Sequence, residues 1–217
     1  MDNQTKKVNI RKFERQDREE VRRISYRTSF LGHGKDFIDD ESIVADGLTL
    51  YFTDDEPDSC FVAVHEGKVI GYLIASADVP SMDKIFSRKI IPHLFFEILK
   101  RGLLLRKKTW VFMFHCTASF LKGEFNIPRL SPKYPATFHI NIEEGFQRQG
   151  IGQRLVKVFL EHLKSRHVHG VYVSTFSEKA KDFFLRLGFR VIFTAPRTYM
   201  HYRLDFVSTL YILGMSL

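Results

Sequence analysis

A glycine-containing bend between a predicted strand and a predicted helix is the feature that most constrains this chain. Apolar residues alternate over 136–142, which predicts a strand, and recur at helical spacing over 150–165, which predicts a helix. The bend that joins them reads Gln147-Arg148-Gln149-Gly150-Ile151-Gly152. A helix that begins there leaves its first backbone N–H groups free beside the positive end of its dipole, and glycine lets a ligand approach closely. We therefore expect residues 147–152 to bind a phosphate-bearing ligand.

Two common phosphate-binding patterns do not fit this bend. A dinucleotide fingerprint requires a third glycine where this chain has Leu155, and a P-loop requires Gly-Lys-Ser/Thr where Gly150 is followed by Ile151. The pattern that does fit is Q/R-x-x-G-x-G/A, read here as Gln147-x-x-Gly150-x-Gly152. It resembles the pyrophosphate-binding motif of the GCN5-related N-acetyltransferase (GNAT) superfamily, whose members bind acetyl-CoA.

A second motif strengthens this resemblance. Residues 168–175 predict a short buried strand, Ser177 is a candidate N-cap for a helix over 178–187, and Gly188 is its predicted stop. Residues 180–189 read AKDFFLRLGF, which resembles the superfamily pattern A-x-x-F-Y-x-x-x-G-F. The two motifs follow in the family's order, and the run YPATFHINI over 134–142 is similar to that of a bacterial subgroup. The chain thus resembles a bacterial-type GNAT protein.

The remaining pattern predicts an α/β fold. Further strands are expected at 8–13, 60–65, 68–77, 189–195 and 198–205, with a hairpin turn at Glu66-Gly67. Helices are expected after Asp17, as N-cap, with Val21, Ile24 and Phe30 on one side, and over 39–51. This mixed order predicts a central sheet with helices on both faces. The resemblance implies the GNAT fold, an α+β mixed sheet that is mostly antiparallel.

One long segment departs from the family pattern. We interpret 1–217 as a single GNAT domain in which 80–133 is a helical insertion subdomain before the fourth strand. Its apolar residues are flanked by basic ones over 100–108, so a lid over the acceptor pocket and a helix at a membrane surface are the alternatives to simple packing on the sheet. The apolar tail 206–217 is expected to pack, and a homodimer contact there is a guess.

The resemblance implies acetyl transfer from acetyl-CoA by direct attack of an amine on the thioester. The cofactor is expected in a cleft where strand 136–142 diverges from strand 171–174. The residues expected to bind it are Ile140, Asn141, Ile142, Gln147, Arg148, Gln149, Gly150, Ile151, Gly152, Ser177 and Phe184.

The catalytic candidates are a base and an acid. An acceptor amine must lose a proton before attack, and His139, Glu143 and Glu144 are the candidate bases; His139, Asn141 and Glu143 share one face of their strand. The family often supplies a tyrosine to the departing thiolate, but this chain has Phe184 there. A thiol pKa of about 8.5 makes the thiolate a fair leaving group without help. Tyrosines that could substitute are Tyr134, Tyr172, Tyr199 and Tyr202.

Composition limits the partners without choosing among them. The net charge of +8 suits an anionic ligand such as CoA, but also nucleic acid or an acidic membrane. We expect a small-molecule amine as partner, neither nucleic acid nor a membrane surface, and no metal. Cys60 and Cys116 suggest reduced thiols in a cytoplasmic protein. The alternatives are a non-catalytic CoA-binding regulatory module and a protein or peptide N-acetyltransferase.

Overall fold

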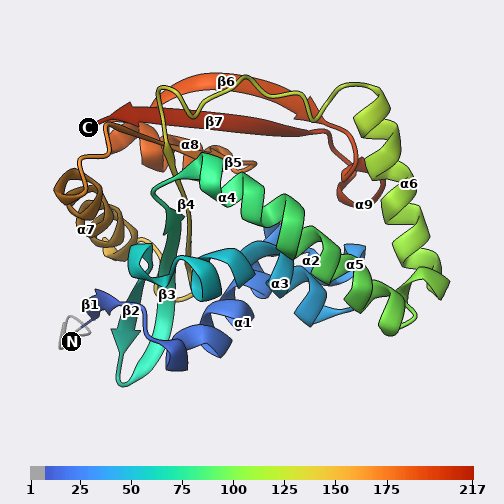
Figure 1. The fold of residues 1–217 in the computed structure, drawn as a ribbon, viewed down its shortest axis with the longest axis horizontal. Coiled ribbons are helices and arrows are strands. Elements are labelled where there is room, and N and C mark those ends of the chain that lie inside the picture. The colour runs from blue at the N-terminus through green and yellow to red at the C-terminus, as the bar shows by residue number, and fades with distance from the viewer. Residues whose placement is uncertain (1–7) are drawn as a thin grey trace.

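A single sheet of seven strands organises residues 8–217, the part of the chain that a computed structural model describes (Figure 1). Its strands lie in the order β1-β2-β3-β4-β5-β7-β6. Neighbours are antiparallel except for β4 and β5, which run parallel. The predicted mostly antiparallel mixed sheet is therefore confirmed. The strands are β1 (Asn9–Lys12), β2 (Phe61–His65), β3 (Lys68–Ser76), β4 (Ala136–Ile142), β5 (Gly170–Thr175), β6 (Arg190–Arg197) and β7 (Ser208–Ser216).

Helices cover both faces of the sheet, as the sequence pattern predicts. Alternation along β3 divides its side chains: Leu73 joins the core under α7 and α8, whereas Tyr72 and Ile74 join the core under α1. Figure 1 shows α7 near one end of the molecule and α6 at the other. The helices are α1 (Arg18–Thr28), α2 (Gly34–Phe37), α3 (Glu41–Leu50), α4 (Val79–Ile85), α5 (Ile91–Lys100), α6 (Lys107–Leu121), α7 (Ile151–Ser165), α8 (Glu178–Arg186) and α9 (His201–Leu204).

The sequence prediction was wrong about which segment forms the last strand. Residues 198–205, expected as a strand, hold the short helix α9, which ends at Asp205 in a left-handed conformation (φ 54°). The apolar tail instead forms β7, which pairs with β5 on one side and β6 on the other. A strand flanked on both sides needs apolar residues such as Ile212 and Leu213, both buried, and 198–205 is too polar for that place. The tail therefore packs, as expected, while a homodimer stays a prediction.

Two details at the first helix also differ from the sequence prediction. Asp17 precedes α1, but its carboxylate accepts from the backbone N–H of Glu14 (2.9 Å) and pairs with Arg11 (2.6 Å) instead of capping α1. The helix ends at Thr28, so Phe30 lies beyond it with a positive φ of 49°. Its ring stacks on Phe37 (4.7 Å between centroids), and this aromatic contact replaces the expected place on the apolar side of α1.

The segment between β3 and β4 is largely helical. Helix α4 continues through a π-helical turn at Phe86–Ile90 into α5, and a short 3-10 turn at Leu103–Leu105 leads to α6. Phe112, on the inner side of α6, packs against Phe30 and Phe37, which anchors α6 to the body of the protein. Among the described helices, none is long and apolar enough to cross a membrane. Cys60 and Cys116 are free thiols.

The aromatic core between β4 and α7 provides a stability test. The ring of Phe159 is fully buried and lies 5.3 Å from that of Phe138. Phe159→Ala should therefore lower the free energy of unfolding by about 3–5 kcal/mol, because burial is lost and a cavity remains. Leu185→Ala, at a side chain that is 42% exposed, should cost well under half as much in the same urea titration. Equal losses for the two variants would contradict this core.

Candidate active site

The site begins where β4 and β5 separate. Within the described chain the two strands pair only at Ala136 with Val171 and at Thr137 with Tyr172. Beyond Thr137, β4 stays paired with β3 as far as Ile142, and β5 stays paired with β7 as far as Thr175. The edge of β4 that faces β5 therefore carries backbone groups without a strand partner, which an extended ligand can use as a neighbouring strand would. This opening lies at the predicted cleft.

The bend after β4 presents the N-terminus of α7. Gly150 precedes the helix in a left-handed conformation (φ 76°), and Arg148 also has a positive φ of 60°. The first helical hydrogen bond runs from the N–H of Arg154 to the carbonyl of Gly150 (3.1 Å). The N–H groups of 151–153 therefore have no acceptor within the helix, and they stand at its positive end.

Two glutamines stabilise this bend with their side chains. The amide of Gln147 donates to the carbonyl of Ile142 (3.0 Å), and that of Gln149 donates to the carbonyl of Gly145 (2.9 Å). Both amides thus hold the loop, and only their backbone groups remain for a ligand. Arg148 is exposed and makes no ion pair with the described residues.

The two glycines of the motif have different surroundings. A Cβ on Gly150 would meet nothing within 4 Å, so open space faces its backbone. A Cβ on Gly152 would lie 3.3 Å from the ring of Phe183 and 3.8 Å from Ile140, so this glycine lets α7 approach α8 and β4 closely. The combination of free N–H groups, open space at Gly150 and the strand opening fits the diphosphate and pantetheine arm of a coenzyme A.

In the second motif, the two residues predicted to bind the cofactor, Ser177 and Phe184, both have structural roles. Ser177 caps α8: its hydroxyl accepts from the N–H of Ala180 (3.3 Å). Phe184 is buried, 2% exposed, with its ring 5.8 Å from that of Phe138 and 5.6 Å from that of Phe189. The family's tyrosine position is therefore part of the aromatic core in this chain. Contact of either residue with the cofactor stays a prediction.

A cavity of about 410 Å³ lies beside the strand opening. The sheet provides its polar side, α3 and the following turn provide one wall, and α4 and α5 of the 80–133 segment provide the other. Asp83 is the one carboxylate in this lining. The lining residues are Gly47, Leu48, Phe52, Met82, Asp83, Phe86, Ser87, Ile91, Thr137, His139, Tyr172 and Ser174.

His139 is the one predicted base that lines this cavity. Solvent reaches its imidazole, whose ring lies 5.6 Å from that of Phe52, edge to face. Neighbouring protein atoms still remove part of the water around the ring, and this loss of solvation disfavours the charged form and lowers the pKa of His139 below its usual 6.5. The side chain is therefore neutral at pH 7 and able to accept a proton.

The other predicted polar residues of β4 have partners outside the cavity. Asn141 donates its side-chain amide to the hydroxyl of the buried Tyr72 (2.7 Å). Glu143 accepts from Arg23 of α1 at 2.6 Å, and Glu144 is exposed on the following turn. The shared face of 139, 141 and 143 is thus oriented toward α1, yet only His139 among them reaches the cavity. Glu143 and Glu144 remain predicted bases without supporting geometry.

The structure separates the four tyrosines proposed as substitutes for the missing acid. Tyr172 lines the cavity from β5, and burial raises its pKa. Tyr134 is buried beside Gly214, whereas Tyr199 and Tyr202 belong to the aromatic cluster around Met200. Asp83, which the sequence reasoning missed, comes from the insertion, and no local motif marks it. Thr137 and Ser174 follow from strand alternation with His139 and Tyr172.

The chain belongs to the acetyltransferase (GNAT) family: the family model matches residues 20–189. It is accordingly an acyltransferase that uses acetyl-CoA. Among the described side chains, no group of three or more His, Cys, Asp or Glu is placed to hold a metal ion.

Solved structures share the whole fold. The structure titled SsHAT is 25% identical, with a TM-score of 0.69, and the match covers 96% of this chain and 98% of that one. A Salmonella typhimurium protein, yncA, solved with acetyl-CoA, is 13% identical (TM-score 0.58, 97% and 94% covered). A Drosophila melanogaster polyamine N-acetyltransferase that forms N-acetylagmatine is 13% identical as well (TM-score 0.56, 97% and 100% covered). No curated protein sequence matched.

The glycine bend predicts a specific loss of cofactor binding. Gly150→Glu should weaken acetyl-CoA binding roughly tenfold or more, because a carboxylate would stand among the N–H groups that face the diphosphate. Isothermal titration of the purified protein with acetyl-CoA measures this.

The hairpin provides a matched control for this substitution. Gly67 has φ +77°, against +76° for Gly150, and a Cβ there also meets nothing within 4 Å. Gly67→Glu therefore adds the same charge and a comparable backbone strain in the β2–β3 hairpin, outside the predicted cofactor-binding residues, and it should leave the affinity unchanged. Equal losses in the two variants would contradict the assignment of the bend.

Proposed function

We propose that this protein transfers the acetyl group of acetyl-CoA to the primary amine of a small molecule bound in the cavity between β4, β5 and the 80–133 segment. The observation that carries the proposal is the cavity itself: it lies at the opening between β4 and β5 and contains both His139 and Asp83. Its volume of about 410 Å³ lies within the range of small-molecule sites. A cavity of this volume suits a small amine.

The lining defines the acceptor as an amine with an apolar body. Phe52, Met82 and Phe86 give the cavity an apolar wall, while Asp83 offers one carboxylate for a single ammonium group. Asp83 is exposed at the cavity wall, and the partial loss of solvation there raises its pKa above the usual 3.8; an ammonium ion beside it would favour the charged carboxylate again. A polyamine with several charges would leave its other charges against apolar side chains, which is unfavourable.

The proposed mechanism uses His139 as the base. The amine enters as an ammonium ion held by Asp83 and gives one proton to the neutral imidazole of His139. Acetyl-CoA, when bound, would supply the thioester carbonyl that the freed amine attacks. The C–N bond would form as the C–S bond breaks, and the second proton of the amine nitrogen would pass to the departing sulfur, which gives the amide and the free coenzyme thiol. Backbone groups at the free edge of β4 and the N–H groups of 151–153 keep the coenzyme oriented. The Tyr172 side chain lines the same cavity, and its hydroxyl could donate a hydrogen bond to the departing sulfur.

A free-thiol assay with purified protein, acetyl-CoA and a panel of amines tests the proposal. Thiol release with monoamines that carry an apolar group is the expected result. Acetyl-CoA binding with no thiol release across the panel would favour the non-catalytic CoA-binding module, for which the phenylalanine at 184 is the motivation. Release with lysine or N-terminal peptides alone would favour a protein or peptide N-acetyltransferase.

The pH dependence of kcat reports on His139. Its neutral form is the active base, so kcat should be constant above the pKa of His139 and fall as the pH drops through it. Because burial lowers that pKa, the fall should lie below pH 6.5. His139→Gln should lower kcat roughly a hundredfold or more and remove this acid limb. His201→Gln, at an exposed histidine of α9, should keep both the rate and the limb; an unchanged profile in the His139 variant would exclude His139 as the base.

Binding of the amine reports on Asp83. Asp83→Asn should raise the KM for the amine about tenfold and change kcat little, because it removes a charge-assisted hydrogen bond to the ammonium group. Asp58→Asn, at an exposed carboxylate on the loop before β2, removes the same charge and should behave as the wild type. If KM stayed constant for Asp83→Asn, the ammonium group would have to be held by another residue.

A further inference from the structure

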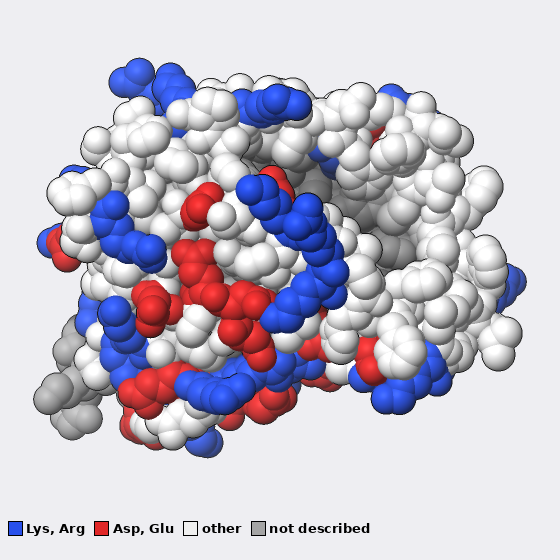
Figure 2. Space-filling model, viewed as in Figure 1, with Lys and Arg blue, Asp and Glu red and all other residues white. Residues whose placement is uncertain are grey.

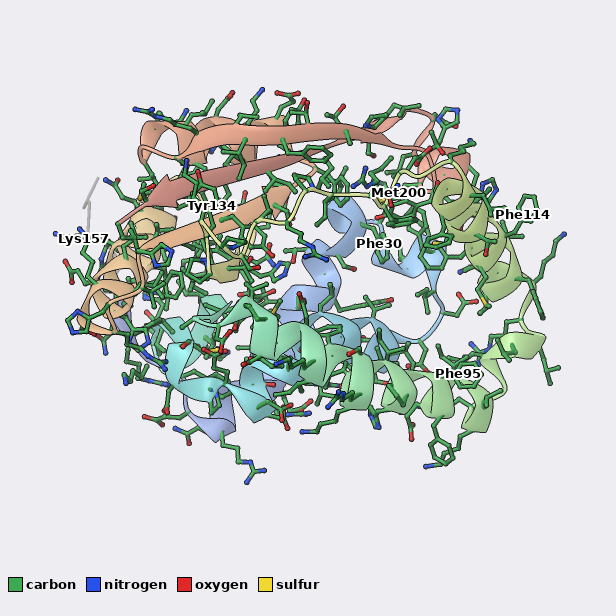
Figure 3. All side chains as sticks on the ribbon, turned by 45° about the horizontal axis from the view of Figure 1, so that its top comes forward. Phe30, Phe95, Phe114, Tyr134, Lys157 and Met200 are labelled. Atoms are coloured by element: carbon green, nitrogen blue, oxygen red, sulfur yellow. The ribbon has the colours of Figure 1, made fainter. Side chains whose placement is uncertain are left out.

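The outer side of the α5–α6 segment is apolar and uncovered. On α6, one face points away from the protein, while Phe112 and Ser119 point inward. The outward residues are Trp110, Met113, Phe114 and Leu121. Their exposed fractions are large: 57% for Trp110, 69% for Phe114 and 80% for Leu121. Figure 3 shows Phe114 on the outer side of α6, away from Phe30 and Met200. This outer apolar surface consists of Ile91, Phe95, Phe96, Leu99, Leu105, Trp110, Met113, Phe114 and Leu121.

The same segment carries the whole net charge of the protein. Residues 80–133 contain 11 Lys and Arg against 3 Asp and Glu, a balance of +8, which equals the net charge of the chain. The other residues are balanced, 22 against 22. In Figure 2 the surface over α5 and α6 is largely uncharged. A run of Lys and Arg borders it on the left and further cations lie at its lower edge, whereas most Asp and Glu gather to the left of that run and below it. The excess of positive charge therefore belongs to the segment that carries the apolar surface.

Several of these cations have no acidic partner within the described chain. Lys89, Arg101 and Lys108 pair with acidic groups, which ties the insertion to α3 and its neighbours. Arg106 and Lys107, by contrast, are exposed at the start of α6 and make no ion pair with residues 8–217. They lie next to Leu105, whose side chain is 91% exposed. Free cations beside exposed aromatic and aliphatic groups match the chemistry of an anionic lipid surface.

We infer that the outer apolar surface docks on an anionic lipid bilayer, with α6 lying in the plane of the headgroups. Trp110, Phe114 and Leu121 would enter the boundary of the acyl chains, while Arg106 and Lys107 would contact anionic headgroups. A second copy of this chain is a poorer occupant, because it would bring two segments of charge +8 together. The sequence predicts no contact with a membrane surface, but it cannot show which side chains are exposed. Docking on lipid is independent of the proposed acceptor amine.

The single tryptophan of the chain provides the readout. Trp110 is the one Trp in the sequence and lies within the proposed docking surface. When the full chain is mixed with vesicles of phosphatidylcholine and phosphatidylglycerol, its emission should shift to shorter wavelength and be quenched by brominated lipid. Vesicles of phosphatidylcholine alone should give a much weaker shift, and added salt should reduce binding to the anionic vesicles.

Matched variants separate the apolar and the electrostatic contributions. Arg106→Gln/Lys107→Gln should weaken partitioning about tenfold or more. Lys157→Gln/Lys164→Gln removes the same charge from α7, at the other end of the molecule, and should bind as the wild type (Figures 1 and 3). Phe114→Ser/Leu121→Ser keeps Trp110 and should lose most binding, whereas Leu185→Ser/Val191→Ser, at side chains 42% and 41% exposed, should not.

Three results would overturn the inference. They are no partitioning onto anionic vesicles at low salt, equal losses in the α6 and α7 charge variants, and a concentration-dependent dimer that shields Trp110 without lipid. Light scattering after size exclusion detects such a dimer, and that outcome would assign the surface to a second copy of the chain. Circular dichroism of each variant confirms that the fold is kept.

Discussion

The early separation of β4 from β5 is the constraint on which the rest of the site depends. Two parallel pairs, at Ala136 and Thr137, hold the strands together, and the sheet survives the opening because β3 and β7 pair with the outer edges. The separation leaves polar backbone groups that require a partner, and it makes room for a cavity beside His139. In the proposed mechanism, the acetyl-CoA site and the amine site both arise where hydrogen bonding between β4 and β5 is interrupted.

The 80–133 segment has two sides with different physical roles. Its inner side contributes Asp83 and Phe86 to the cavity, so under the proposed function it would help determine which amine fits. Its outer side exposes Phe95 and Phe114, which no described part of the chain covers. Ile91 belongs to both sets, since it lines the cavity and is 55% exposed. The mouth of the cavity therefore borders the outer apolar surface, and an amphiphilic amine at a lipid surface would lie close to that mouth.

Local sequence signals predicted the cofactor bend, while features that depend on distant segments were missed. Gly150 and the start of α7 follow from residues within a few positions, because a positive φ and a free helix end are local properties. β7 was missed because its place between β5 and β6 depends on pairing across the sheet. From the sequence alone, residues 198–205 were predicted as the last strand instead. Asp83 was missed for the same reason: it shares a cavity with His139 only because the chain returns to the sheet more than fifty residues later.

The phenylalanine at the family's tyrosine position changes how the leaving thiolate must be stabilised. Phe184 contacts Phe138 and Phe189, so this site is apolar and offers no hydroxyl. Tyr172 lines the cavity, but burial raises its pKa above the usual 10, which makes it a weaker acid than a free tyrosine. A coenzyme thiol, with a pKa of about 8.5, is already more acidic than either form. Protonation by Tyr172 would therefore contribute little driving force. In the proposed mechanism the transfer depends mainly on proton removal by His139 and on the orientation of the thioester at the open edge of β4.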